Sequence, residues 1–151
     1  MSYWLIKSEP DVYSINDLKR DKKTWWDSIR NYQARNYLLA FKPQDLCLFY
    51  YSNAKPCAVV GIAECTHMAK PDQLQFDPKS DYFDPKATFE KPRWFAPQLK
   101  FKEIFLGPVS LEAIKANKEL HSMVLVKSSR LSVQPVTAKE FETIVTMGHT
   151  K

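Results

Sequence analysis

The sequence predicts an α+β fold in which a curved, mostly antiparallel sheet or small barrel of five to six strands is flanked by short helices. Short apolar or alternating runs typical of strands recur along the chain, and the capped helical segments between them do not follow the regular order of βαβ units. With 151 residues, 44% hydrophobic and 26% charged, the chain has the size and composition of one globular domain. We therefore expect residues 1–151 to form a single domain.

The N-terminal segment predicts one strand followed by one short helix. Residues 3–7 are aromatic and apolar and are followed by a Ser-Glu-Pro sequence, which ends a strand. The spacing Ser14-x-x-Asp17 is typical of a capping box, in which each of the two side chains satisfies a backbone N–H group at the start of a helix. A short helix is expected to begin there.

A second helix is expected between the first basic stretch and Pro43. Asp27 or Ser28 can cap its start, and the proline marks its end. On such a helix Asn31 and Arg35 are four residues apart, so their side chains would project from one face.

The middle of the chain predicts a β-hairpin. Residues 46–51 and 58–65 have strand character, and residues 52–56 supply the turn between them. Gly61 interrupts the second strand, which indicates a bulge or a close approach of another backbone segment.

Residues 69–93 predict a long ordered loop. Four prolines divide this stretch and leave it with little periodicity, while its four aromatic residues would be costly to leave in water. Residues 94–105 return to strand character, and Pro97 favours an edge or bulged strand.

The last third predicts two helices and two strands. Ser110 can cap a short helix through Ala116, and Thr137 opens a capping box for a terminal helix. Residues 123–126 and 131–136 are expected to be strands.

Composition argues against several classes of function. Three glycines are too few to build phosphate-cradling loops easily, and neither a dinucleotide nor a P-loop motif occurs. The net charge of +5 is concentrated in residues 19–35 and 91–102, stretches that suit a phosphate backbone but also suit an ordinary solvated surface. No apolar run is long enough for a membrane span and the start lacks a secretory signal, so a cytoplasmic protein without a membrane partner is expected.

The cysteines and histidines do not form a recognisable metal or nucleophile motif. Cys47, Cys57 and Cys65 make an odd set without a CxxC pair, and the three histidines are scattered. Motifs of serine hydrolases and of zinc peptidases are also missing. We expect no metal, no cofactor and no catalytic constellation.

Aromatic residues interleaved with arginine, asparagine and serine give the positive signal. Residues 25–31 place two tryptophans beside a guanidinium and an amide, and residues 91–95 repeat the mixture. Capture of an unstacked base needs flat rings for stacking, fixed polar groups for the base edge and cations for phosphate. Each tryptophan taken singly could equally belong to the core; Trp4 is assigned there, while Trp26 remains open.

Several segments, taken in order along almost the whole chain, resemble the EVE domain family of the PUA-like superfamily. The matching pieces are YWLIKSEP (3–10), WDSIRNYQARN (26–36), LFYYSN (48–53), VVGIAE (59–64), FDPKSDYFDPK (76–86), KPRW (91–94), VSLEAIK (109–115) and LSVQPVT (131–137). The resemblance implies a PUA-like mixed or antiparallel sheet or pseudo-barrel. It also implies a pocket for a flipped, modified base of RNA or DNA, with modified cytosine the leading candidate.

Carried onto this chain, the resemblance implies a pocket lined or supported by Ser8, Glu9, Trp26, Arg30, Asn31, Arg35, Ser52, Leu131, Ser132 and Val133. Trp26 would stack on the base, Asn31 and Ser8 would read its polar edge, and Leu131 and Val133 would close an apolar floor. The basic stretches would supply the phosphate contacts, from Lys22, Lys23 and Arg93.

Other roles are open for half of these residues. Glu9 and Arg30 could pair with each other or with a backbone group and hold only the shape of the site. Arg35 would anchor phosphate or fix a neighbouring side chain. Ser132 could be an ordinary strand hydroxyl, and Ser52 could simply end the hairpin strand.

The sequence departs from the family pattern at two positions. Ser28 stands where the family commonly has glycine, and Tyr51 stands where it commonly has histidine. If either borders the pocket, ligand preference would change.

Two other functions compete with base recognition. One is an enzyme that acts on a modified base or nucleotide with Glu9 or Asp27 as general base. The other is a regulatory domain that binds a small metabolite or a protein. The sequence leaves the oligomeric state open.

Overall fold

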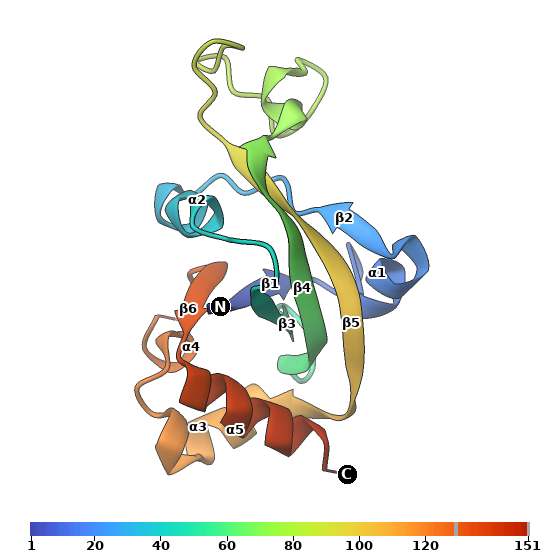
Figure 1. The fold of residues 1–151 in the computed structure, drawn as a ribbon, viewed down its shortest axis with the longest axis vertical. Helices are drawn as coiled ribbons and strands as arrows, with labels where there is room; N and C mark the ends of the chain where they lie inside the picture. The colour runs from blue at the N-terminus through green and yellow to red at the C-terminus, as the bar shows by residue number, and fades with distance from the viewer. Residues whose placement is uncertain (129, 151) are drawn as a thin grey trace.

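A six-stranded sheet runs through the molecule, with helices on both of its faces (Figure 1). The computed structural model describes residues 1–128 and 130–150. Its elements are β1 (Tyr3–Ser8), α1 (Ile15–Asp21), β2 (Lys23–Trp25), α2 (Tyr32–Leu39), β3 (Leu46–Tyr51), β4 (Ala58–Pro71), the 3-10 helix η1 (Gln73–Phe76), β5 (Phe95–Ser110), α3 (Leu111–Ala116), the 3-10 helix η2 (Lys118–Leu120), α4 (Val124–Lys127), β6 (Val133–Val136) and α5 (Ala138–Gly148).

The strands lie in the order β2-β5-β4-β3-β1-β6. Within the described residues only β1 and β3 pair in parallel, and every other neighbouring pair is antiparallel. The long strands β4 and β5 sweep from the α3–α5 end of the molecule to the loop at the opposite end (Figure 1). The predicted α+β class with a mostly antiparallel, mixed sheet is confirmed.

Gly61 marks a close backbone approach within the sheet. The β3–β4 register shifts between Phe49 and Tyr50, directly beside the partner position of Gly61. A Cβ atom on Gly61 would collide with the Glu103 carbonyl oxygen and with the Ile15 side chain. A larger residue would collide there, so the glycine is required by packing, as its place in the strand predicts.

Alternate residues of β1 enter two separate cores because successive strand side chains point to opposite faces of a sheet. Trp4 and Ile6 join a core covered by α1 and α2. Leu5 joins the other core, which α3, α4 and α5 cover at the bottom of Figure 1. The Trp4 indole also donates a hydrogen bond to buried Asp45 at 3.0 Å, which satisfies its polar atom inside the core.

Three predicted helix starts are confirmed. The Ser14 hydroxyl accepts from the Asp17 amide while the Asp17 carboxylate accepts from the Ser14 amide, and Thr137 and Glu140 form the same reciprocal pair. The Ser110 hydroxyl accepts from the Ala113 amide at the start of α3. Each contact satisfies a backbone N–H group that a helix start leaves unpaired.

The predicted start of the second helix is wrong. Helix α2 begins at Tyr32, and its N-cap is Asn31 rather than Asp27 or Ser28. Ser28 has a φ angle of 71°, outside the right-handed helical region, and its amide donates to Asp72 of a distant loop. That tertiary contact keeps residues 26–30 out of the helix.

The strand predicted at residues 123–126 is also wrong, because Val124–Lys127 form the single-turn helix α4. A short apolar run does not distinguish a strand from a buried helical turn. Here Met123 and Leu125 both pack into the core that α3, α4 and α5 cover.

The strands on either side of the proline-rich stretch are longer than predicted, since β4 extends to Pro71 and β5 to Ser110. Pro97 lies in β5 between two neighbouring strands, so it is not on an edge, but the β4–β5 register is irregular beside it. Among residues 1–128 and 130–150, no helix is both long and apolar enough to cross a bilayer.

Candidate functional site

A hollow of about 550 Å³ opens between the end of β1 and the segment that leads to α2. This volume is within the roughly 300–1,000 Å³ typical of ligand pockets. The hollow is lined by Lys7, Ser8, Glu9, Val12, Tyr13, Thr24, Trp25, Trp26, Asp27, Ser28, Ile29, Ser52, Tyr82, Arg130 and Ser132. The structure therefore brings together five of the ten residues expected at the pocket, namely Ser8, Glu9, Trp26, Ser52 and Ser132.

Trp26 belongs to both the core and the hollow. The residue is 8% exposed, and the rings of Tyr13 and Phe49 meet its indole edge to face at centroid distances of 6.3 and 5.6 Å. These contacts fix the plane of the indole before any ligand arrives, which lowers the entropic cost of stacking on it. Burial and a hydrogen bond to Asp21 raise the pKa of Tyr13 to about 12, so its phenol stays neutral at physiological pH.

Side-chain oxygen atoms of Ser8, Glu9, Asp27 and Ser28 also belong to the lining of the hollow. The Ser8 hydroxyl donates to the Tyr13 carbonyl at 2.6 Å, which ties the end of β1 to the next turn. The Ser28 hydroxyl donates to the Asp27 carboxylate at 3.1 Å. Glu9 accepts from the Asn53 amide at 2.9 Å. The walls of the hollow are thus rich in acceptors for the amino groups of a ligand.

Asp27 is reachable by solvent, yet the protein around its carboxyl group disfavours the charged form. Partial burial raises the pKa of Asp27 above its ordinary value, and the nearby carboxylate of Asp72 raises it further. The hydrogen bond from Ser28 acts in the opposite direction. Perturbed carboxyl groups in a hollow are typical of binding and catalytic sites.

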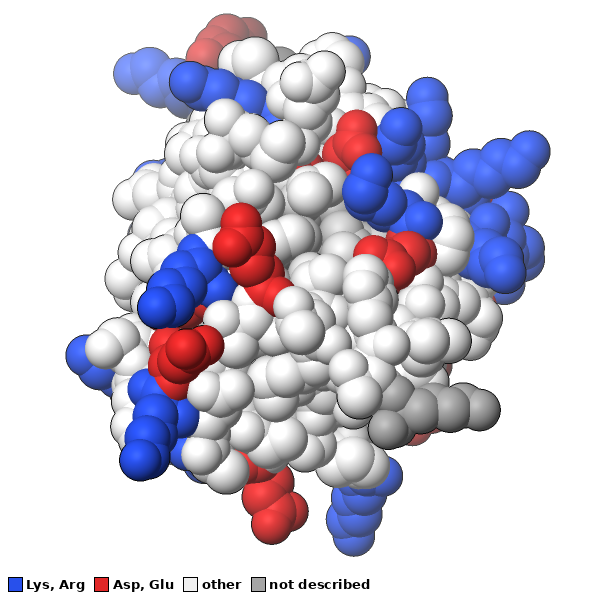
Figure 2. All heavy atoms as spheres, turned by 60° about the horizontal axis from the view of Figure 1, so that its bottom comes forward, with Lys and Arg blue, Asp and Glu red and all other residues white. Residues whose placement is uncertain are grey.

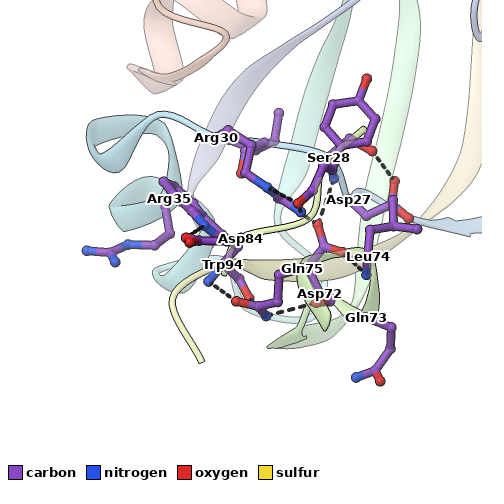
Figure 3. A network of polar contacts seen from close by, with 12 residues as sticks. Asp27, Ser28, Arg30, Arg35, Asp72, Gln73, Leu74, Gln75, Asp84 and Trp94 are labelled. Carbon is purple, nitrogen blue, oxygen red and sulfur yellow. Dashed lines mark hydrogen bonds and ion pairs between the residues drawn. The ribbon is translucent and has the colours of Figure 1, made fainter. Parts of the chain in front are cut away.

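A buried carboxylate, Asp72, holds the wall of the hollow to the proline-rich loop (Figure 3). It accepts from the Ser28 amide at 2.8 Å, from the Arg30 guanidinium at 3.0 Å and from the Leu74 amide at 2.8 Å. Arg30 in turn donates twice to the Tyr82 carbonyl, at 3.0 and 2.9 Å. These hydrogen bonds hold the loop in the position in which Tyr82 lines the hollow.

A second set of bonds closes the base of the same loop. The buried Gln75 amide donates to the Trp94 carbonyl at 2.8 Å and accepts from the Trp94 amide at 3.0 Å, and the Trp94 indole donates to Asp84 at 2.8 Å (Figure 3). The hydrogen bond from Trp94 lowers the pKa of Asp84 below its ordinary value. The expected long loop is therefore held in one shape by side chains from within it.

The other five residues expected at the pocket do not line it. The Asn31 side chain caps α2 by accepting from the Ala34 amide at 2.9 Å. Arg35 donates to the Arg93 carbonyl at 3.1 Å and lies over the Tyr32 ring. Leu131 and Val133 are buried in the core that α1 and α2 cover. Arg30 donates to Asp72 and to the Tyr82 carbonyl.

Glu9 and Arg30 do not pair with each other, but the alternative of a backbone partner holds for Arg30, which donates to the Tyr82 and Ile29 carbonyls. Arg30 pairs with Asp72 and Glu9 with the Asn53 amide. Tyr51, one of the two departures from the family pattern, accepts from the Ile15 amide at the start of α1 rather than lining the hollow. Ser28, the other departure, does line it.

None of the three residues expected to contact phosphate lines the hollow. Lys22 and Lys23 are exposed and immediately precede the Thr24–Trp26 wall. Arg93 donates to the Tyr32 hydroxyl and lies 3.7 Å from the Asp84 carboxylate, so its charge is partly compensated. Figure 2, with the α3–α5 end brought forward, shows Lys and Arg gathered at the margins of that face around a broad uncharged area.

Sequence reasoning missed seven residues that line the hollow: Lys7, Val12, Tyr13, Thr24, Ile29, Tyr82 and Arg130. Arg130 directly precedes the Leu131–Val133 segment, and a cation beside a suspected pocket segment was a usable signal. Tyr82 had no such signal, because its place depends on the Asp72 contact made 10 residues earlier in the chain.

The described residues contain no group of three or more His, Cys, Asp or Glu placed to hold a metal ion. Burial raises the pKa of Cys65 to about 11 and that of Cys47 well above its ordinary value. Both thiols are therefore protonated at physiological pH and are poor nucleophiles.

Comparison with known families agrees with this architecture. The sequence profile described as the EVE domain matches residues 2–147. This chain belongs to the EVE domain family. The resemblance inferred from the sequence is thereby confirmed.

Relatives within the family align over nearly the whole chain. The alignment with thymocyte nuclear protein 1 of Mus musculus is 169 positions long, with 36% identity. It covers 99% of this chain and 75% of that protein. A solved protein from Leishmania major is 44% identical, with a TM-score of 0.94 over 98% of this chain and 94% of that one. Human thymocyte nuclear protein 1, solved in complex with DNA that contains 5-methylcytosine, is 33% identical, with a TM-score of 0.94 over 100% of this chain and 99% of that one.

Proposed function

We propose that this EVE-domain protein binds nucleic acid and holds one flipped, modified base, with modified cytosine the leading candidate, in the hollow beside Trp26. The observation that carries the proposal is the convergence of a plane-fixed indole with serine and carboxylate oxygens in one hollow of about 550 Å³. The DNA complex of the human relative, whose fold is nearly the same, supports the choice of target.

The chemistry of the walls suits a methylated cytosine. Trp26 offers a ring for stacking, and Ile29 and Val12 offer apolar surface to a methyl group. Asp27 and Ser8 place acceptor oxygens in the wall, and carboxylates accept hydrogen bonds from the exocyclic amino group of cytosine. Arg130 and the nearby Lys22 and Lys23 would contact the phosphates on either side.

We also propose that the site binds without catalysis. The raised pKa of Asp27 is the one observation that favours an enzyme, because a general base often has such a pKa. Incubating the protein with modified nucleotides and oligonucleotides separates the two functions. Binding without any change in the ligand is expected; product formation that is lost in Asp27→Asn would establish the enzyme.

The test of base recognition is an affinity comparison between two oligonucleotides that differ by one methyl group. Fluorescence anisotropy is measured with cytosine or 5-methylcytosine at the same position, as single and double strands of DNA and of RNA. Burying one methyl group contributes about 0.8 kcal/mol, so a preference of about fourfold or more is expected for the methylated strand. Equal affinities for cytosine and 5-methylcytosine in all four forms, the single and double strands of DNA and of RNA, would refute recognition of this modification.

A further inference from the structure

A second hollow lies directly beside the first. It has a volume of about 500 Å³, and its walls include Trp25, Asp27, Lys70, Leu74 and Ala96. Trp25 and Asp27 line both hollows. The two cavities therefore lie on either side of a shared partition.

Trp25 is the unusual part of this partition. It is the last residue of β2 and is 37% exposed, whereas the adjacent Trp26 is buried. Neighbouring strand residues point in opposite directions, so burial of Trp26 turns the Trp25 ring outward. Its ring meets the His67 ring edge to face at 5.5 Å. An exposed aromatic ring beside a hollow offers the kind of surface on which an unstacked base can stack.

Charge around the second hollow suits a nucleotide. The Lys70 ammonium lies over the Trp25 ring, 5.3 Å from its centre, so a base that stacks on this face would displace the flexible lysine side chain towards the phosphate. Asp72 already accepts from two backbone amides and from Arg30. Asp27 is consequently the carboxylate positioned to accept from an amino group in either cavity. Leu74 and Ala96 supply an apolar wall.

We propose that this second hollow holds the base adjacent to the modified one in the same strand, stacked on Trp25, with its phosphate near Lys70. This inference rests on the proposed function and extends it to a two-nucleotide site. Two hollows that share Trp25 and Asp27 as lining residues suit two consecutive units of one strand. Because Asp27 accepts but does not donate when charged, the neighbour is expected to carry an exocyclic amino group, as adenine, cytosine and guanine do.

The experiment is a coupling measurement between Trp25 and the neighbouring base. Affinities are measured for single-stranded oligonucleotides with one 5-methylcytosine, flanked on each side in turn by a base or by an abasic unit. In the unaltered protein, removing the base on one side should weaken binding about 5- to 150-fold, as expected for one aromatic stacking contact. In Trp25→Leu the same removal should change affinity less than twofold, and Trp25→Phe should restore most of the effect.

The matched control is Leu106→Ala, which removes an exposed apolar side chain, 68% exposed, that lines neither hollow. There the abasic unit should cost as much as in the unaltered protein. An equal cost of base removal in Trp25→Leu and in the unaltered protein would overturn the second site. If the unaltered protein also fails to prefer 5-methylcytosine, the proposed function itself fails; a retained preference without coupling refutes only the two-nucleotide site.

A measurement on the unaltered protein covers the case in which Trp25→Leu does not fold. The indole N–H signal of Trp25 is followed by NMR while each oligonucleotide is added. It should shift with the oligonucleotide that carries the neighbouring base and stay near its free position with the abasic one. The same shift with both would overturn the proposal.

Discussion

Asp72→Ala tests whether one buried carboxylate holds the loop to the wall of the hollow. The Asp72 side chain is 1% exposed and its Arg30 partner 21%, so solvent screens this pair little. Removing the carboxylate leaves the Ser28 and Leu74 amides and the Arg30 guanidinium without their acceptor. Breaking a buried pair from one side costs about 3–5 kcal/mol. The free energy of unfolding should fall by that amount.

Urea denaturation followed by tryptophan fluorescence measures this loss, and hydrogen exchange at the Ser28 and Leu74 amides shows whether it is local. The matched control is Asp77→Ala in the same loop, where an exposed carboxylate accepts from the Lys79 amide at 2.9 Å. That change should cost less than about 1 kcal/mol. Affinity for the modified strand should also fall in Asp72→Ala, because Tyr82 is released. If Asp72→Ala and Asp77→Ala unfold at the same urea concentration, the assigned role of Asp72 is refuted.

Four further predictions follow from the geometry of the site. Trp26→Ala should lower the free energy of unfolding by about 3–5 kcal/mol in denaturation and abolish the preference for the modified base in anisotropy, whereas Trp26→Phe should retain part of both; an unchanged preference in Trp26→Ala would contradict stacking. Changing Lys22 and Lys23 to glutamine should weaken binding of all oligonucleotides alike and reduce the salt slope by about 1 per lysine, and a selective loss of modified-base binding would count against backbone contact. Because the pKa of Asp27 is raised by folding, the folded state binds the proton more tightly, and stability falls as pH rises from the ordinary carboxyl pKa through the raised one. Asp27→Asn should therefore be more stable than the unaltered protein at neutral pH, with the difference vanishing in acid; a constant difference across the titration would refute this. Ser28→Gly should leave the free energy of unfolding within about 1 kcal/mol, since relief of the positive φ offsets the extra chain entropy of glycine, whereas Ser28→Val should lower it by more than about 1 kcal/mol; equal denaturation midpoints for the two would be contrary to the strain argument.

Local sequence signals predicted those parts of the fold that local chemistry decides. The capping pairs at Ser14 and Thr137 are complete within four residues, so their helices could be placed from the sequence. The α2 start could not, because the contact that keeps Ser28 out of the helix comes from Asp72, 44 residues away. Helix α4 was missed because its apolar residues satisfy a buried helical turn as well as a strand.

The candidate site likewise contains positions that could be predicted from the sequence and positions that depend on contacts between distant segments. Ser8, Glu9, Ser52 and Ser132 lie at strand ends or beside them, where the chain leaves the sheet, and the resemblance placed them together in the hollow. Asn31 was expected to read the base, but asparagine before an apolar helix is also a strong N-cap, and that local role describes its contact here. The place of Tyr82 in the hollow could not be predicted from the sequence, because it depends on how the whole loop folds.

The central claim is that a modified base lies against Trp26 within the hollow. The most direct measurement is an intermolecular nuclear Overhauser effect from the methyl protons of 5-methylcytosine in a bound oligonucleotide. We predict contacts from that methyl group to the ring protons of Trp26 and Tyr13, and none to Trp4 or Trp94. The indole N–H groups of Trp4 and Trp94 donate hydrogen bonds to Asp45 and Asp84 within the protein. A methyl group in contact only with neighbouring bases of its own strand would contradict the account.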